Sequence, residues 1–172
     1  RSEMREYTIY IDAISKVFAA TGIRVGWSMG PATVIGKMKA ILTHIGAWAP
    51  MAEQKAVANY LGKRESIKSY LSHFKNEIEE RLRSIYDGFT QLKSEGFSVD
   101  AITPEAAIYL TIKVDLAGKK TAEGKLLENQ ADVTAYLLSA AGLAVVPFYA
   151  FGADKSSPWY RLSVGTCKKE EI

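Results

Sequence analysis

Two basic residues with nearby glycines form the stretch of this sequence that is best suited to chemistry. Lys16 and Arg24 lie eight positions apart (24 minus 16), and Gly22 and Gly26 bracket the arginine. A lysine held at a strand end can lose the hydration of its ammonium group, which favours the neutral amine that condenses with aldehydes. The guanidinium of arginine is a planar fork of donors that suits phosphate, and glycine lets the backbone approach a bound group. The stretch therefore predicts a site for an aldehyde cofactor that carries a phosphate.

A longer pattern surrounds these residues. It resembles the pyridoxal-phosphate attachment signature of class I/II aminotransferases, the aspartate aminotransferase family of fold type I. The matching positions are Ile14, Ser15, Lys16, Ala19, Ala20, Gly22, Arg24, Val25 and Gly26. The resemblance implies that Lys16 forms the Schiff base with pyridoxal 5'-phosphate and moves the proton at the substrate α-carbon. It also implies that Arg24 binds the phosphate. The family usually has Gly or Ser where this chain has Ala13, so Ser15 is the candidate hydroxyl for that contact.

A third basic residue lies near the end of the chain. Arg161 stands within Trp159–Gly165, a segment that resembles the C-terminal segment of the same family. The resemblance implies that Arg161 binds the α-carboxylate of the substrate, a task that suits its bidentate donor geometry. Without the lysine pattern upstream, the simpler interpretation is a strand arginine with an ion-pair partner on the surface.

Other chemistries have little support in the sequence. His44 and His73 have no metal-ligand spacing and no thiolate partner, so we expect no metal site. A serine–lysine hydrolase based on Ser15 and Lys16 has no accompanying oxyanion-loop pattern.

The composition of the chain does not indicate a particular class of partner. The chain has 172 residues, 48% of them hydrophobic and 24% charged, and a net charge of +3. These values are typical of a globular domain, and the small charge gives no reason to expect nucleic acid or a membrane as partner. No apolar run reaches transmembrane length. The lone Cys167 fits a reducing compartment, so we expect a cytoplasmic protein.

The first half of the chain must position Lys16 and Arg24. Residues 7–12 and 24–29 are predicted strands. Helical spacing of apolar residues predicts helices over 32–45 and 51–61. A longer apolar stripe predicts one long helix, starting at a Ser66 cap and ending at Gly96.

The second half alternates strands and helices. We expect a strand over 107–116, a polar loop over 118–124, a helix over 129–141, and strands over 143–146 and 159–164. The fold class is therefore α/β, with helices on one face of the second-half sheet. The resemblance implies the C-terminal part of a fold type I enzyme: residues 1–68 would close the large cofactor-binding domain, and 69–172 would form the long connecting helix and the small domain.

The resemblance also implies a function. It points to a pyridoxal-phosphate aminotransferase, of aspartate or aromatic type, that transfers an amino group from an amino acid to a 2-oxo acid. This chain would be its C-terminal portion, and the full-length parent a homodimer. Two alternatives stay open. One is another fold type I activity, such as a C–S lyase or an aminocyclopropane-carboxylate-type synthase. The other is an inactive fragment that acts only as a folded or interacting domain.

Overall fold

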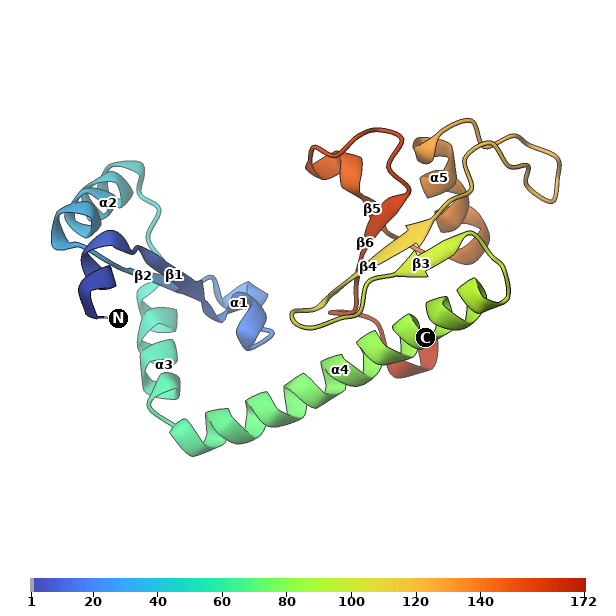
Figure 1. Cartoon of the computed structure of the whole chain (residues 1–172). Helices are drawn as coiled ribbons and strands as arrows, with labels where there is room; N and C mark the ends of the chain where they lie inside the picture. Colours follow the sequence, from blue (N-terminus) through green and yellow to red (C-terminus); the bar gives the residue numbers. More distant parts are fainter. Residues whose placement is uncertain (1) are drawn as a thin grey trace. The chain divides into compact units, whose positions relative to one another are not determined.

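The computed structural model describes residues 2–172, which divide into two compact units (Figure 1). Unit 1 is Arg1–His73 and unit 2 is Phe74–Ile172. The helix α4 (Arg64–Ser94) is continuous across this boundary. Each unit is described by itself below. In the described residues, no helix combines the length and the apolar character that a membrane crossing needs.

Unit 1 holds two short strands and several helices. Its elements in chain order are η1 (Ser2–Tyr7), β1 (Tyr10–Ala13), α1 (Ile14–Val17), η2 (Thr21–Ile23), β2 (Gly26–Met29), α2 (Ala32–Ile45) and α3 (Met51–Leu61). The helices predicted over 32–45 and 51–61 are confirmed. Both predicted strands begin too early, although the second ends at Met29 as predicted. Residue 7 ends a 3-10 helix, and Arg24 has a left-handed conformation that no strand accommodates.

The two strands of unit 1 form one antiparallel pair. β1 pairs with β2 in a register that runs from Tyr10 opposite Met29 to Ala13 opposite Gly26. A side chain at position 26 would place its Cβ 2.9 Å from the backbone oxygen of Asp12. Glycine is therefore required at this position, because the two backbones approach too closely for any Cβ.

The long helix α4 begins earlier than its predicted cap. It starts at Arg64, so Ser66 lies inside the helix instead of capping it, and that prediction is wrong. The end is as predicted: Gly96 adopts φ 91°, a conformation that favours glycine and stops the helix.

Unit 2 is built on a four-stranded antiparallel sheet. Its strands are β3 (Val99–Ala101), β4 (Tyr109–Val114), β5 (Val146–Pro147) and β6 (Trp159–Ser163), in the order β3-β4-β6-β5. β3 was not predicted, because three residues are too few to show an alternating pattern. β5 starts later than the predicted 143–146 strand and includes Pro147. This proline is tolerated since β5 is an edge strand.

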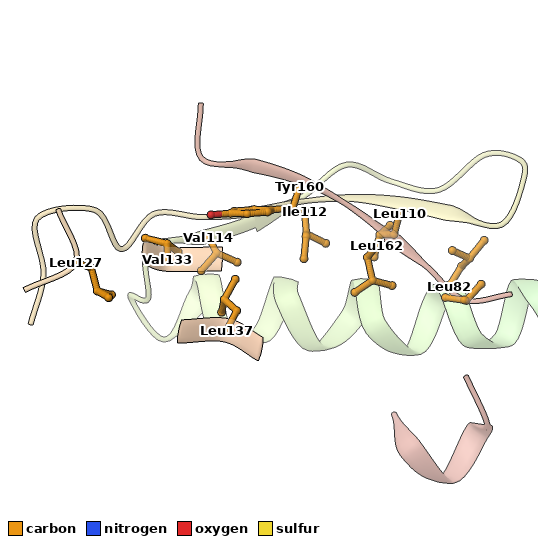
Figure 2. Packing of buried hydrophobic residues seen from close by; sticks show 10 residues of the cluster. Leu82, Leu110, Ile112, Val114, Leu127, Val133, Leu137, Tyr160 and Leu162 are labelled. Atoms are coloured by element: carbon orange, nitrogen blue, oxygen red, sulfur yellow. The ribbon is translucent and has the colours of Figure 1, made fainter. Parts of the chain in front are cut away.

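One face of this sheet is covered by helices, as predicted. Alternate residues of β4 and β6 are buried, and they pack with Leu82 of α4 and with Val133 and Leu137 of α5 (Gln130–Ala141). Figure 2 shows Ile112 and Leu162 pointing from the strands toward the long helix α4. The buried members of this core are Leu82, Leu110, Ile112, Val114, Leu127, Val133, Leu137, Tyr160, Leu162 and Val164.

A polar contact fixes α5 to β6 within this core. The Tyr160 hydroxyl donates a hydrogen bond of 2.7 Å to the Gln130 side-chain oxygen, and both residues are buried. Burial raises the pKa of Tyr160 above its ordinary value, so the hydroxyl stays protonated and remains a donor. The neighbour of Tyr160 on β6 is Arg161, whose register is set by its pairing with Thr111 of β4.

Candidate functional site

A closed loop carries Lys16 and Arg24. The Ile14 N–H donates to the Val25 carbonyl at 3.2 Å, and this bond joins the two ends of the loop. Within it, the Ala20 N–H donates to the Ser15 carbonyl at 3.0 Å. Lys16 lies on α1 two residues after Ile14, and Arg24 directly precedes Val25. The fold therefore brings the predicted lysine and arginine onto one short hydrogen-bonded loop.

Two residues of this loop have left-handed backbone conformations. Ala19 has φ 49° and Arg24 has φ 58°. This region is uncommon for residues other than glycine, and such strain is often found at functional sites. The Arg24 guanidinium turns back and donates from Nη1 to the Thr21 carbonyl at 3.0 Å. Backbone shape and side-chain contact together set the direction of this arginine.

Apolar side chains fix the loop to the rest of unit 1. Ile14 and Val25 are buried and share a small cluster with Val57 of α3. The Phe18 ring packs against Tyr60 and Tyr70, with centroids 5.5 Å and 6.2 Å away. The loop is thus held at its base while its polar residues face outward.

The predicted reactive residues differ in exposure. Lys16 is exposed and Ser15 is half-buried. The described residues 2–172 leave Lys16 open to solvent, so the expected desolvation of its ammonium group stays a prediction. Arg24 is also exposed.

Arg161 lies in unit 2, on the sheet face opposite the core. Its neighbours Tyr160 and Leu162 point inward, and Arg161 itself is half-buried. Its guanidinium carbon lies over the Tyr109 ring at 4.5 Å and over the Phe151 ring at 4.6 Å. Neither ring contact was predicted from the sequence. Strand alternation places Tyr109 on this face, but the return of the loop that carries Phe151 has no local sequence signal.

The residues of unit 1 fit a phosphorylated aldehyde cofactor. Lys16 offers an amine, Arg24 offers a guanidinium and Ser15 offers a hydroxyl, which are the donors that an aldehyde and a phosphate need. A Cβ added to Gly22 would meet nothing within 4 Å, so there is open space beside the loop. Of the ion pairs among the described residues, none includes Lys16 or Arg24.

An α/β chain with this lysine loop, a long helix and a small antiparallel sheet has part of the architecture of fold type I transferases. It belongs to the family "Aminotransferase class I and II", whose model matches residues 2–172. The resemblance found in the sequence and the expected fold class are both confirmed.

Individual relatives agree with this family. An aspartate aminotransferase of Rhizobium meliloti is 29% identical over 97% of this chain and 38% of its own length. A probable aspartate/prephenate aminotransferase of Rickettsia prowazekii (strain Madrid E) is 30% identical over 98% of this chain and 40% of its own. This chain therefore spans about two fifths of the length of the curated relatives it matches.

Solved structures show the same fold. The crystal structure of the Rhizobium meliloti aspartate aminotransferase superposes with a TM-score of 0.80 at 28% identity, covering 99% of this chain and 40% of that one. An aromatic aminotransferase from Pyrococcus horikoshii OT3 gives a TM-score of 0.79 at 24% identity, covering 98% of this chain and 41% of its own. The second likeness concerns the fold alone.

Proposed function

We propose that this chain is part of a pyridoxal-phosphate aminotransferase that moves an amino group between an amino acid and a 2-oxo acid. The observation that carries this proposal is the loop closed by Ile14 and Val25, which holds Lys16 and Arg24 together. The names of the curated relatives favour substrates of the aspartate, aspartate/prephenate or asparagine type. They favour amino-group transfer over a C–S lyase or a cyclopropane-forming synthase.

Each predicted residue has a separate role in this proposal. Lys16 would hold the cofactor through its amine and, once released by the substrate, would carry the proton at the substrate α-carbon. Arg24 and Ser15 would hold the phosphate by charge-assisted and neutral hydrogen bonds. Arg161 would orient the substrate through its α-carboxylate. Pyridoxal phosphate, when bound, supplies the electron sink for this chemistry.

The chain alone should have little or no transaminase activity. It spans about two fifths of the length of its relatives, and Lys16 is exposed in it. We propose that the remaining part of a full-length parent desolvates Lys16 and completes the cofactor site. A homodimeric parent and a cytoplasmic location belong to the same proposal.

Borohydride trapping tests the role of Lys16. The full-length parent is mixed with pyridoxal phosphate, reduced and digested, and the phosphopyridoxyl label is located by peptide mass mapping. We expect the label on Lys16 in preference to Lys37, an exposed lysine of α2. Equal labelling of exposed lysines would contradict a dedicated attachment site.

Substitution of Arg161 tests the carboxylate site in the full-length parent. Arg161→Ala should raise KM for both the amino acid and the 2-oxo acid, since both carry the α-carboxylate. The loss corresponds to roughly 2–5 kcal/mol for a buried charge pair. Steady-state kinetics with both substrates measures it, and unchanged KM values would leave Arg161 without this role.

A further inference from the structure

We propose that Tyr109 and Phe151 are positioning residues that hold the Arg161 guanidinium by its faces. Only the in-plane N–H edge then remains for a ligand, and the site selects planar carboxylates over tetrahedral oxyanions. This inference rests on the proposed function of Arg161 as a carboxylate-binding residue. It adds two residues and a selectivity rule to that function.

The two rings come from different parts of unit 2. Tyr109 begins β4 and pairs with Ser163 of β6, while Arg161 pairs with Thr111 two residues further along β4. Residues two apart on a strand share a face, so Tyr109 and Arg161 are diagonal neighbours across the two strands. This contact is fixed by the sheet register, and it depends on no loop.

Phe151 reaches the same guanidinium from a turn. It ends η3 (Phe148–Phe151), which follows the edge strand β5. Gly152 has φ 91°, and its N–H donates to the Tyr149 carbonyl at 3.1 Å. The Ala153 N–H donates to the Phe148 carbonyl at 3.2 Å. These bonds fix the end of the turn, so the Phe151 ring is held over Arg161 by backbone structure.

The arrangement determines how Arg161 can bind. Aromatic faces attract a guanidinium and cover its flat sides. Its donors all lie in the plane of the group, in a fork that matches the two oxygens of a carboxylate. No ion pair among the described residues includes Arg161, so none of their carboxylates competes for this edge. A phosphonate or sulfonate has a third oxygen outside the plane, where it would meet a ring.

Benzoate and phenylphosphonate are matched probes of this selectivity, because they differ only in the head group. Binding of each to the 172-residue chain is followed by NMR titration of the Arg161 side-chain N–H signals. We expect Tyr109→Leu and Phe151→Leu each to lower the ratio of benzoate to phenylphosphonate affinity by roughly 3- to 10-fold. The change in this ratio is the readout, since the different charges of the two probes cancel in it.

Two further variants distinguish the positioning of the Arg161 guanidinium from a general loss of order in unit 2. Tyr109→Phe keeps the ring and should keep the ratio. Phe97→Leu removes another exposed aromatic ring of unit 2 and should leave the ratio unchanged. Phe151 is 55% exposed, so its replacement should not unfold the unit.

Three results would overturn the inference. They are the absence of benzoate binding to the original chain, an unchanged ratio in both leucine variants, or an equal loss in Tyr109→Phe and Tyr109→Leu. The labelling of Lys16 by pyridoxal phosphate does not depend on these rings. A failure of the proposed function at Lys16 is therefore distinguishable from a failure of this inference.

Discussion

The two units of this chain differ sharply in how they bury apolar side chains. Unit 2 has a core of ten buried residues in one cluster, several of them almost inaccessible, such as Ile112 at 0% and Leu110 at 1% exposure. Among the described residues of unit 1, the cluster has three buried members, Ile14, Val25 and Val57. Unit 1 also exposes large apolar side chains, including Tyr7 at 82% and Ile11 at 71%.

This difference shows that the proposed cofactor residues lie on the less buried unit. Backbone hydrogen bonds and the close approach of β1 to β2 shape the lysine loop, while a small cluster holds its base. Exposed apolar groups on this scale normally mark a surface that is covered in the working protein. In unit 2, by contrast, the sheet and two helices form a core that keeps Arg161 in register.

Replacing Lys16 should have the largest effect on function and almost none on folding. Lys16→Ala in the full-length parent should reduce transamination to near background, because the attachment amine and the proton carrier are both lost. The thermal unfolding midpoint of the 172-residue chain by itself should hardly change, since Lys16 is exposed there. Amino-transfer assays and calorimetry on Lys16→Ala and on the control Lys37→Ala measure both effects. Normal turnover in Lys16→Ala would remove this residue from the mechanism.

Core truncation compares the packing of the two units directly. Ile112→Ala in unit 2 should cost roughly 2–5 kcal/mol of unfolding free energy, as buried large-to-small changes do. Ile14→Ala in unit 1 should lie near the lower end of that range, because its sparse surroundings can relax. Urea unfolding followed by hydrogen exchange of peptides from each unit measures the two losses separately. Equal losses of unfolding free energy in the two variants would contradict the difference in packing between the two units.

Substitution of two glycines tests whether close backbone approach shapes unit 1. Gly26→Ala should cost roughly 1–3 kcal/mol, the usual range for overpacking, because its Cβ would lie 2.9 Å from the Asp12 backbone oxygen. Gly22→Ala is the matched control, since its Cβ meets nothing within 4 Å. Hydrogen exchange of β1 and β2 amides should rise only in Gly26→Ala. The same rise in both variants would be inconsistent with this account.

The smallest expected effect is an acid dependence of unit 2. The Lys93 side chain donates a 2.7 Å hydrogen bond to Asp100, and this bond, with one from the Ala101 N–H, lowers the pKa of Asp100 below its ordinary value. Because the pKa of Asp100 is lower in the folded than in the unfolded chain, its ionised carboxylate stabilises the fold at any pH above the unfolded-state pKa. That contribution is lost as the pH falls through the folded-state pKa.

Asp100→Asn should therefore lose a little stability near neutral pH and show a weaker acid-induced decline. Unfolding midpoints between neutral and acidic pH measure this, with Asp87→Asn, an exposed aspartate of α4, as the control. Parallel pH profiles for Asp100→Asn and the original chain would show that the ion pair contributes nothing.

Much of the fold was predictable because local patterns are strong where elements are long. The helices over 32–45 and 51–61 match the predicted bounds, and the long helix starts at Arg64, before its predicted cap Ser66. Short elements were less predictable. β3 has three residues and β5 has two, so their pairing partners, and not their own sequences, make them strands.

The candidate site was likewise only partly predictable from the sequence. The identities of Lys16, Arg24, Ser15 and Arg161 come from the sequence, because their side-chain chemistry and spacing follow a recognisable pattern. Sequence could not place Tyr109 and Phe151 on Arg161, since the first contact needs the register of two strands and the second needs the return of a turn.

The sequence by itself thus determined the family, the helices and the reactive residue types. These depend on side-chain chemistry and on periodicities within a few turns of chain. Only the tertiary structure decided that the lysine loop closes through Ile14 and Val25, that Lys16 is exposed, and that two rings cover Arg161. Those features depend on how residues from different elements meet in the fold, and no local pattern specifies that geometry.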